Sequence, residues 1–190
     1  MPKKGLLTKE TVTSAALSLW RKGEKLNARA LAAELHCSTQ PIFSLFSGME
    51  EVHAAAAAAA TKVYTDFLSL HMSAGKYPPY KASGMAYIAF AKEETELFKL
   101  LFMRDRSREA PADGRLGPET RPLIERLCTS LGLTEEEAYA FHVQMWIYVH
   151  GMASMIATGF LEWKEDVASS LLTKAYEGLR YVYTNEERNQ

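Results

Sequence analysis

The chain has 190 residues, of which 47% are apolar and 24% are charged, and its formal net charge at pH 7 is −1. This balance is typical of a globular protein with one domain, or with a small domain joined to a larger one, and it excludes a disordered tail. No apolar run approaches the roughly 20 residues that span a bilayer, and the N-terminus lacks the apolar core of a signal peptide. We therefore expect a cytoplasmic protein without a membrane segment.

Charge is unevenly distributed along the chain. Residues 1–49 hold seven Lys or Arg and three acids, which gives this part a net charge of +4 and leaves the remainder acidic. A basic first quarter favours contact with a polyanion, although lysine-rich surface helices without a partner are also common.

Three short stretches of helical periodicity occupy the first 46 residues. The first begins with Thr8 as N-cap and ends at Gly23. Its apolar stripe consists of Val12, Ala15, Ala16, Leu19 and Trp20. The second begins at Asn27, and the third is expected to begin at Ser38, with Pro41 in its first turn. Three short helices at this spacing predict a helix-turn-helix unit, whose third helix lies in the major groove of DNA.

A longer fourth helix follows, with Ser47 and Glu50 at the S-x-x-E spacing of a capping box. It runs through seven consecutive alanines, residues 54–60, to about residue 71. Because alanine is the best helix former, a helix is favoured over low-complexity disorder. Gly75 and the two prolines that follow it predict a turn.

Five more helices are predicted at 80–92, 94–104, 118–131, 134–158 and 163–184. Thr134 and Glu137 offer another capping box for the fourth of these. Residues 104–118 are charged and rich in Pro and Gly, so we expect a mobile loop there. The predicted fold is all-α with about nine helices. A helix-turn-helix domain occupies residues 1–50 and an antiparallel helical bundle occupies residues 51–190.

The polar residues of the third helix suit DNA recognition. Thr39, Gln40 and Ser44 are expected to point outward to base edges, because Gln is a bidentate partner for adenine. Ser38 is expected to cap this helix and leave its other first-turn amides free for a phosphate. The remaining phosphate contacts are predicted at Lys9, Arg29 and the backbone amides of Gly48 and Met49.

Three segments, in this order, resemble the tetracycline-repressor family of bacterial transcriptional regulators. They are LTKETVTSAALSLWRKG, NARALAAELHCSTQPIFSLF and SGMEEV, within about residues 5–55. Farther on, AYIAFAKEETELFKLLF and WIYVHGMASMIATG resemble the C-terminal regulatory domain of one branch of that family, marked by a Trp, His, Gly trio. Trp146, His150 and Gly151 fill those positions. The resemblance covers most of the chain and implies a DNA-binding regulator.

The chain departs from the family pattern at two expected DNA contacts. Phe43 stands where members usually carry a tyrosine whose hydroxyl bonds a phosphate, and Met49 stands where they carry a phosphate-binding lysine. Both changes weaken the electrostatic share of DNA affinity. A helical ligand-binding or scaffolding protein that has lost tight DNA binding is therefore the alternative function.

Little in the sequence points to catalysis. No Ser, His, Asp set and no phosphate loop is visible, so we expect neither an enzyme nor a cofactor. Glu50 and His53 have the Glu-x-x-His spacing of di-iron bundles, but the motif occurs once, and capping explains the glutamate better. Cys37 and Cys128 lack CxxC spacing and are interpreted as buried apolar residues.

Two histidines of the penultimate helix need an interpretation. His142 and His150 are eight residues apart, and with Glu137 they suggest a metal site, so a metal-dependent helical-bundle enzyme is a third hypothesis. The favoured interpretation is that His150 packs or bonds inside the bundle and that Gly151 allows a close helix crossing. No metal site is predicted.

The bundle is rich in aromatic and thioether side chains, which line adaptable apolar cavities as well as cores. The residues alone leave core and cavity open, whereas the family resemblance favours a pocket for a small apolar organic effector. The residues predicted to line it are Phe90, Phe98, Phe102, Met145, Trp146 and Met152.

The last two helices are predicted to form a homodimer interface. An apolar stripe on the final helix is expected to need a covering partner. The stripe consists of Leu171, Leu172, Ala175, Leu179 and Val182. A two-fold dimer matches a palindromic double-stranded operator, so we expect a repressor that a small effector releases from such a site.

Overall fold

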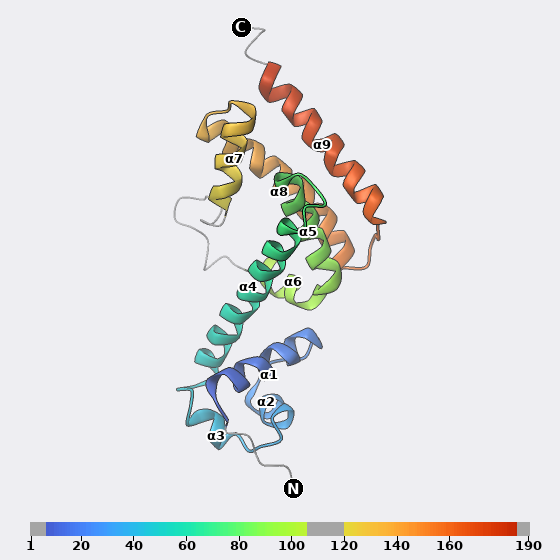
Figure 1. Ribbon diagram of the computed structural model, residues 1–190. Helices are drawn as coiled ribbons and strands as arrows, with labels where there is room; N and C mark the ends of the chain where they lie inside the picture. The colour runs from blue at the N-terminus through green and yellow to red at the C-terminus, as the bar shows by residue number, and fades with distance from the viewer. Residues whose placement is uncertain (1–6, 106–119, 186–190) are drawn as a thin grey trace. The chain divides into compact units, whose positions relative to one another are not determined.

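The computed structural model describes residues 7–105 and 120–185. Within these ranges the chain forms nine α-helices and no strand, which confirms the predicted all-α fold (Figure 1). The helices are α1 (Lys9–Arg21), α2 (Ala28–Glu34), α3 (Gln40–Phe43), α4 (Met49–Ser73), α5 (Pro79–Glu93), α6 (Thr95–Phe102), α7 (Arg121–Leu131), α8 (Glu135–Ala157) and α9 (Glu165–Asn185). None of these helices is both long enough and apolar enough to cross a membrane. The predicted loop at 104–118 falls almost wholly outside the described residues.

The helices form two compact units. The first contains α1, α2, α3, α4 as far as Phe67, and α6. The second contains the end of α4 together with α5, α7, α8 and α9. The predicted division at residue 50 lies inside the first unit, and as a division by function it stays a prediction.

The first unit closes around an apolar core supplied by α1 to α4. Val12, Leu31, Ile42 and Val52 are fully buried there, one from each helix. The Thr8 side chain accepts from the backbone of α1, and that of Asn27 accepts from the backbone of α2, so both predicted N-caps are confirmed. The predicted stripe on α1 faces this core as expected, with Trp20 at its half-buried edge.

Two predicted caps were wrong in detail. Ser38 does not cap α3, because Thr39 occupies the N-cap position with helical backbone angles, and its side chain makes no capping bond. At α4 the glutamate that reaches back is Glu51, which accepts from the Ser47 backbone N–H at 2.7 Å and hydroxyl at 2.9 Å. Glu51 takes the role predicted for Glu50.

The second unit is built on the packing of α5 against α8, with α7 and α9 also packed against α8. Its aromatic core centres on Phe141, which lies 5.4 Å from the ring of Tyr176 and 5.5 Å from that of Tyr183. Thr134 and Glu137 form the predicted capping box at the start of α8. Cys128 packs half-buried at the edge of this core, and Cys37 does so in the first unit, so burial of both cysteines is only partial.

The glycine that permits close helix packing is Gly84 on α5, not Gly151. A Cβ atom at Gly84 would lie 2.8 Å from Leu172 Cδ2 and 3.4 Å from Val149 Cγ2, so α5 approaches both α8 and α9 closely there. A Cβ atom at Gly151 would meet nothing within 4 Å. The expected close crossing at Gly151 was therefore wrong within this chain.

The predicted stripe on α9 is largely covered by the chain itself. Leu172 is buried, and Ala175 and Leu179 pack against the core formed by α7 and α8. Leu172 thus needs no partner, which corrects the prediction for it, whereas Ala175 and Leu179 are only partly covered. Val182, by contrast, is 41% exposed.

Candidate nucleic-acid interface and effector cavity

The turn between α2 and α3 sets the direction of the short third helix. The amide of His36 donates to the Ala33 carbonyl and that of Cys37 to the Ala32 carbonyl, which closes α2 with a Schellman motif. This motif places His36 in the left-handed region, at φ +50°. This turn separates α2 from α3, which is consistent with the predicted helix-turn-helix unit.

The third helix buries one side and exposes a polar edge. Ile42 and the following Phe46 are buried in the core, whereas Gln40 and Ser44 are exposed and Thr39 is partly exposed. The Ser44 hydroxyl donates to the Pro41 carbonyl at 2.7 Å, which leaves its oxygen free to accept a hydrogen bond from a base. The structure thus brings all three predicted base-reading residues to one short exposed segment.

The expected phosphate contacts are less open than the sequence suggested. Lys9 Nζ lies 2.6 Å from the Glu51 carboxylate and 5.0 Å from the centre of the Phe46 ring. The Lys9 ammonium, followed by the Ser47 amide and hydroxyl, lowers the pKa of Glu51 to about 2. At the start of α4, the Lys9 ammonium is therefore already paired with a carboxylate of the chain itself. Arg29, in contrast, is exposed and forms no ion pair with a described residue.

The other predicted contacts differ in exposure. Phe43 is 42% exposed, so an aromatic face without a hydroxyl stands at the predicted phosphate contact. Met49 is half-buried against the core of the first unit, and Gly48 is also partly buried.

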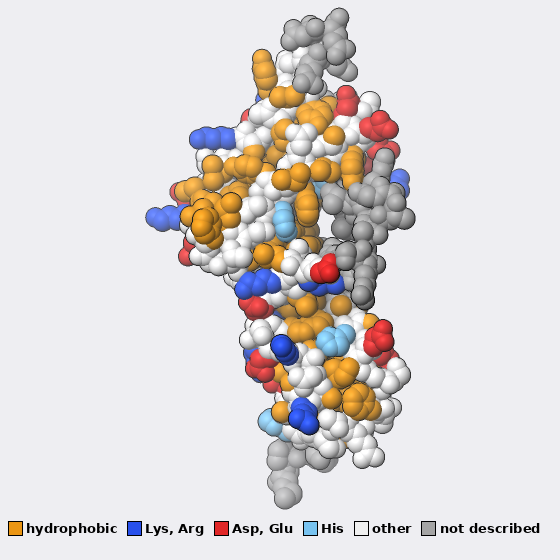
Figure 2. Space-filling view, turned by 180° about the vertical axis from the view of Figure 1, so that it is seen from behind, with side chains coloured by type: hydrophobic (Ala, Val, Ile, Leu, Met, Phe, Trp, Pro, Cys, Tyr) orange, Lys and Arg blue, Asp and Glu red, His pale blue; other side chains and the backbone are white. Residues whose placement is uncertain are grey.

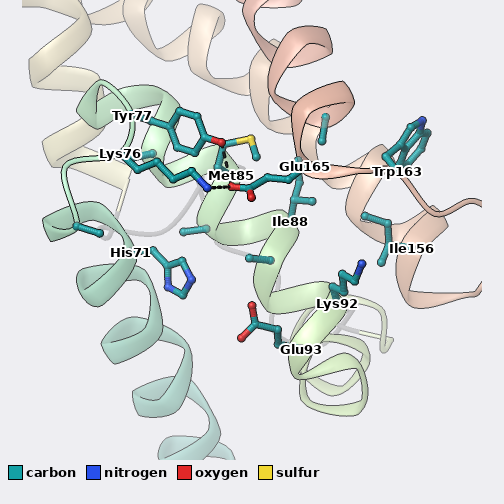
Figure 3. Close-up of a pocket in the computed structure, with 15 residues that line it drawn as sticks. His71, Lys76, Tyr77, Met85, Ile88, Lys92, Glu93, Ile156, Trp163 and Glu165 are labelled. Carbon is teal, nitrogen blue, oxygen red and sulfur yellow. Dashed lines mark hydrogen bonds and ion pairs between the residues drawn. The ribbon is translucent and has the colours of Figure 1, made fainter.

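A cavity of about 470 Å³ lies wholly within the second unit (Figure 3). Its floor is the apolar face of α5, including Met85 and Ile88, and its sides are the end of α4, the α4–α5 connection and the start of α9. Charged and polar side chains surround it, and Trp163 and Ile156 lie on one side. The volume is in the range of sites for small organic molecules.

A family model described as "Tetracyclin repressor-like, C-terminal domain" matches residues 80–175, which is half of the chain. The chain belongs to the tetracycline-repressor family. No curated protein matches the sequence. The match confirms the family inferred from the sequence segments, and membership makes the chain a transcriptional regulator by class. Assignment to the branch marked by the Trp, His, Gly trio stays a prediction.

In this tetracycline-repressor family member, the residues predicted to bind an effector do not line the cavity described above. Phe98 and Phe102 belong to the first unit, where the Phe102 ring packs edge-on against Tyr64 at 5.0 Å. Phe90, Met145 and Met152 are buried in the second unit, and Trp146 is half-buried there. Their role in ligand binding stays a prediction.

Two tyrosine–histidine hydrogen bonds join α5 to α8. Tyr87 Oη lies 2.9 Å from Nδ1 of His150, and the ring of Trp146 stacks on the same imidazole at 4.9 Å. Tyr80 Oη lies 3.0 Å from Nδ1 of His142. Burial lowers the pKa of both histidines, so each imidazole is held neutral. His150 does bond inside the bundle, as the favoured interpretation predicted. No group of three or more potential metal ligands occurs within the described ranges.

Sequence reasoning missed the contacts between distant segments in this family member. Arg21, at the end of α1, donates two hydrogen bonds of 2.8 Å and 2.6 Å to the Glu94 carboxylate, which lies 73 residues away in the sequence. The cavity floor was also missed, although Ala82, Ala86 and Ala89 gave a signal. Small residues at this spacing lie on one face of a helix and leave space above it.

Proposed function

We propose that this chain is a homodimeric repressor whose first three helices bind a palindromic operator and whose C-terminal bundle binds a small organic effector. The observation that carries the DNA-binding part is the exposed polar edge of α3 on the closed core formed by α1 to α4. An effector releases the operator if it favours a dimer conformation in which the two DNA-binding units are too close together or too far apart. The effector can shift the equilibrium between the two conformations by no more than its difference in affinity for them.

Operator binding is the first test. Fluorescence anisotropy with DNA from upstream of the chain's own gene should show saturable binding in the presence of competitor DNA, with affinity that falls as salt rises. Binding that is equally weak on every sequence would contradict the proposal.

Base readout and phosphate contact can be separated by two variants. Gln40→Ala should lower discrimination at one base pair by about 1 to 3 kcal/mol, because a bidentate base contact is lost. Arg29→Ala should weaken all sequences alike and reduce the salt dependence of binding. Uniform weakening by Gln40→Ala would show that this side chain does not read a base.

The proposed dimer interface uses the outer faces of α8 and α9, because the inner face of α9 is covered by the chain itself. Ile147 is 60% exposed on α8, and Val167 and Val182 are exposed on α9. Figure 2 shows apolar side chains exposed over the C-terminal helices. In a two-fold interface one introduced charge appears twice, so Ile147→Asp should split the dimer in a sedimentation experiment.

Leu70→Asp is the matched control for that experiment, because Leu70 is 68% exposed on α4, outside the proposed interface. It should leave the dimer intact. A dimer that survives Ile147→Asp, or a native chain that sediments as a monomer at micromolar concentration, would place the interface elsewhere or remove it.

A second candidate is a ligand-binding protein that has lost tight DNA binding. It is favoured by Phe43, which lacks a hydroxyl, and by the engagement of Lys9 with Glu51. Glu51→Gln distinguishes the two functions, because it frees Lys9. Under the repressor proposal it should tighten an existing operator complex, whereas a protein without DNA binding has no such complex to tighten.

A further inference from the structure

The cavity in the second unit has a flat, apolar floor made by small side chains. Ala82, Ala86 and Ala89 lie at successive positions on one face of α5, where larger residues would fill the space. The half-buried Trp163 and Ile156 form an apolar side beside this floor. A compact hydrocarbon or aromatic body would be desolvated on both surfaces.

The positive charges of the lining are already neutralised by the chain itself. Lys76 Nζ lies 2.6 Å from the Glu165 carboxylate, and the Tyr77 hydroxyl donates to the same carboxylate at 2.9 Å. Lys92 Nζ lies 2.6 Å from Glu162. Figure 3 shows the first of these groups converging at one end of the cavity. An anionic ligand would have to compete with these carboxylates of the chain for the two ammonium groups.

One lining carboxylate has no such partner. Glu93 is exposed at the end of α5 and forms no ion pair with a described residue. In Figure 3 its side chain points away from that of the neighbouring Lys92 and toward the side where His71 lies. The nearby Lys81 does not line the cavity, because its ammonium donates to Thr173 at 2.8 Å and lies over the Tyr77 ring. Among the Lys and Glu side chains of the lining, Glu93 is thus the one without an ion-pair partner in the described residues.

From these observations we infer that the cavity binds an organic cation, an amine or quaternary ammonium ion on a compact apolar body. The apolar body lies on the alanine floor beside Trp163, and the cationic group lies against the Glu93 carboxylate. A cation that binds at this place does not have to break the Lys76–Glu165 pair or the Lys92–Glu162 pair. The inference rests on the proposed function, since it names the chemical class of the effector.

The test uses calorimetry on the full chain with three probes that share a phenylpropyl body. They are phenylpropyltrimethylammonium, its neutral analogue with carbon in place of nitrogen, and 4-phenylbutyrate. The ammonium ion should bind most tightly and the carboxylate least. Glu93→Gln should weaken ammonium binding about three- to fivefold, which is the effect of one partly exposed ion pair, and leave the neutral probe unchanged.

Two further variants locate the site. Ala89→Leu, which fills the space above the floor, should abolish binding of both the ammonium and the neutral probe. Glu136→Gln, at an exposed glutamate on α8 that does not line the cavity, should change neither. Preferred binding of the carboxylate, absence of binding by all three probes, or full ammonium binding by Glu93→Gln or Ala89→Leu would each overturn the inference.

Operator binding is measured separately, without any probe. A chain that binds the ammonium probe through Glu93 but never binds DNA would refute the repressor role and leave the cation site standing. A chain that binds its operator but no cationic probe would refute the cation site alone. Release of the operator by the ammonium probe, at a concentration about three- to fivefold higher for Glu93→Gln, would support both.

Discussion

Different kinds of polar contact stabilise the two units of this regulator internally. In the first unit the ion pair between Lys22 and Glu34 lies at the surface, and such a pair contributes about 0 to 1 kcal/mol. In the second unit two tyrosine–histidine bonds are partly buried between α5 and α8. A buried polar group left without its partner costs about 1 to 3 kcal/mol. The first unit, called the head below, therefore depends mainly on its apolar core and helix caps. The second unit, called the bundle, also depends on internal hydrogen bonds.

The largest effect should come from the closest packing in the bundle. Gly84→Leu would place a side chain where a single Cβ atom already lies 2.8 Å from Leu172, so unfolding free energy should fall by about 3 kcal/mol in chemical denaturation. Gly151→Ala is the matched control on α8. Because a Cβ atom there meets nothing in the protomer, alanine should raise stability by about 0.5 to 1 kcal/mol. Equal effects of both variants would contradict the assigned close approach.

The polar contacts of the two units can be compared directly. Tyr80→Phe removes the partner of the buried His142 and should lower the unfolding free energy by about 1 to 3 kcal/mol. Lys22→Met, which removes an exposed pair in the head, should lower it by less than about 1 kcal/mol. If Lys22→Met lowered the unfolding free energy more than Tyr80→Phe, the proposed difference in polar contacts between the two units would be wrong.

The features that sequence reasoning predicted well are local. Thr8, Asn27 and the Thr134–Glu137 pair cap their helices as predicted, because a cap is decided by residues within three positions of each other. At Ser47 two neighbouring glutamates were both within reach. The one that bonds is Glu51, which also meets Lys9 from a segment 42 residues away. No local pattern shows that contact.

The features that sequence reasoning missed depend on how each helix is rotated about its axis. The pattern identified Leu172 and Leu179 as apolar, but only the packing of α9 shows that they face the chain's own core. Gly84 and Gly151 look equivalent in sequence, and only the packing of the helices distinguishes them, because α8 and α9 both come close to Gly84. The cavity has the same origin, since its lining residues come from four helices and two connections.

As pH falls, the bundle should lose stability before the head does. Burial lowers the pKa of His142 below 6.5, so the unfolded chain takes up more protons as pH falls below that value, and the bundle loses stability first. The pKa of Glu51 is lowered from 4.5 to about 2, so its contribution to the head is present above pH 4.5 and is lost only as pH falls toward 2.

Region-resolved hydrogen exchange between pH 7 and pH 3 would follow this order. His142→Asn removes one titrating group and should weaken the pH dependence of the bundle below pH 6.5, with no change in the first unit. Loss of protection in the head before the bundle would contradict the assignment.

The smallest effect concerns a difference in how the two units end their helices. In the first unit, the residue with positive φ after α1 is Gly23 (φ +70°), but after α2 it is His36 (φ +50°). In the second unit, glycines follow α7 and α8, at Gly132 and Gly159. A left-handed conformation costs a residue with a Cβ atom about 1 to 2 kcal/mol, and glycine avoids this cost. Glycine also adds freedom to the unfolded chain, which removes part of the gain.

His36→Gly should therefore raise the unfolding free energy by about 0.5 kcal/mol, which is the difference between these two effects. His36→Ala is the control, because alanine keeps the Cβ atom and the strained backbone and should give no gain. Chemical denaturation of the two variants side by side measures the difference. If alanine stabilised as much as glycine, the gain would come from loss of the imidazole, and the backbone at the α2–α3 turn would not be a weak point of the head. The expected result would show that the turn which aims the reading helix retains backbone strain that the helix ends of the bundle avoid with glycine.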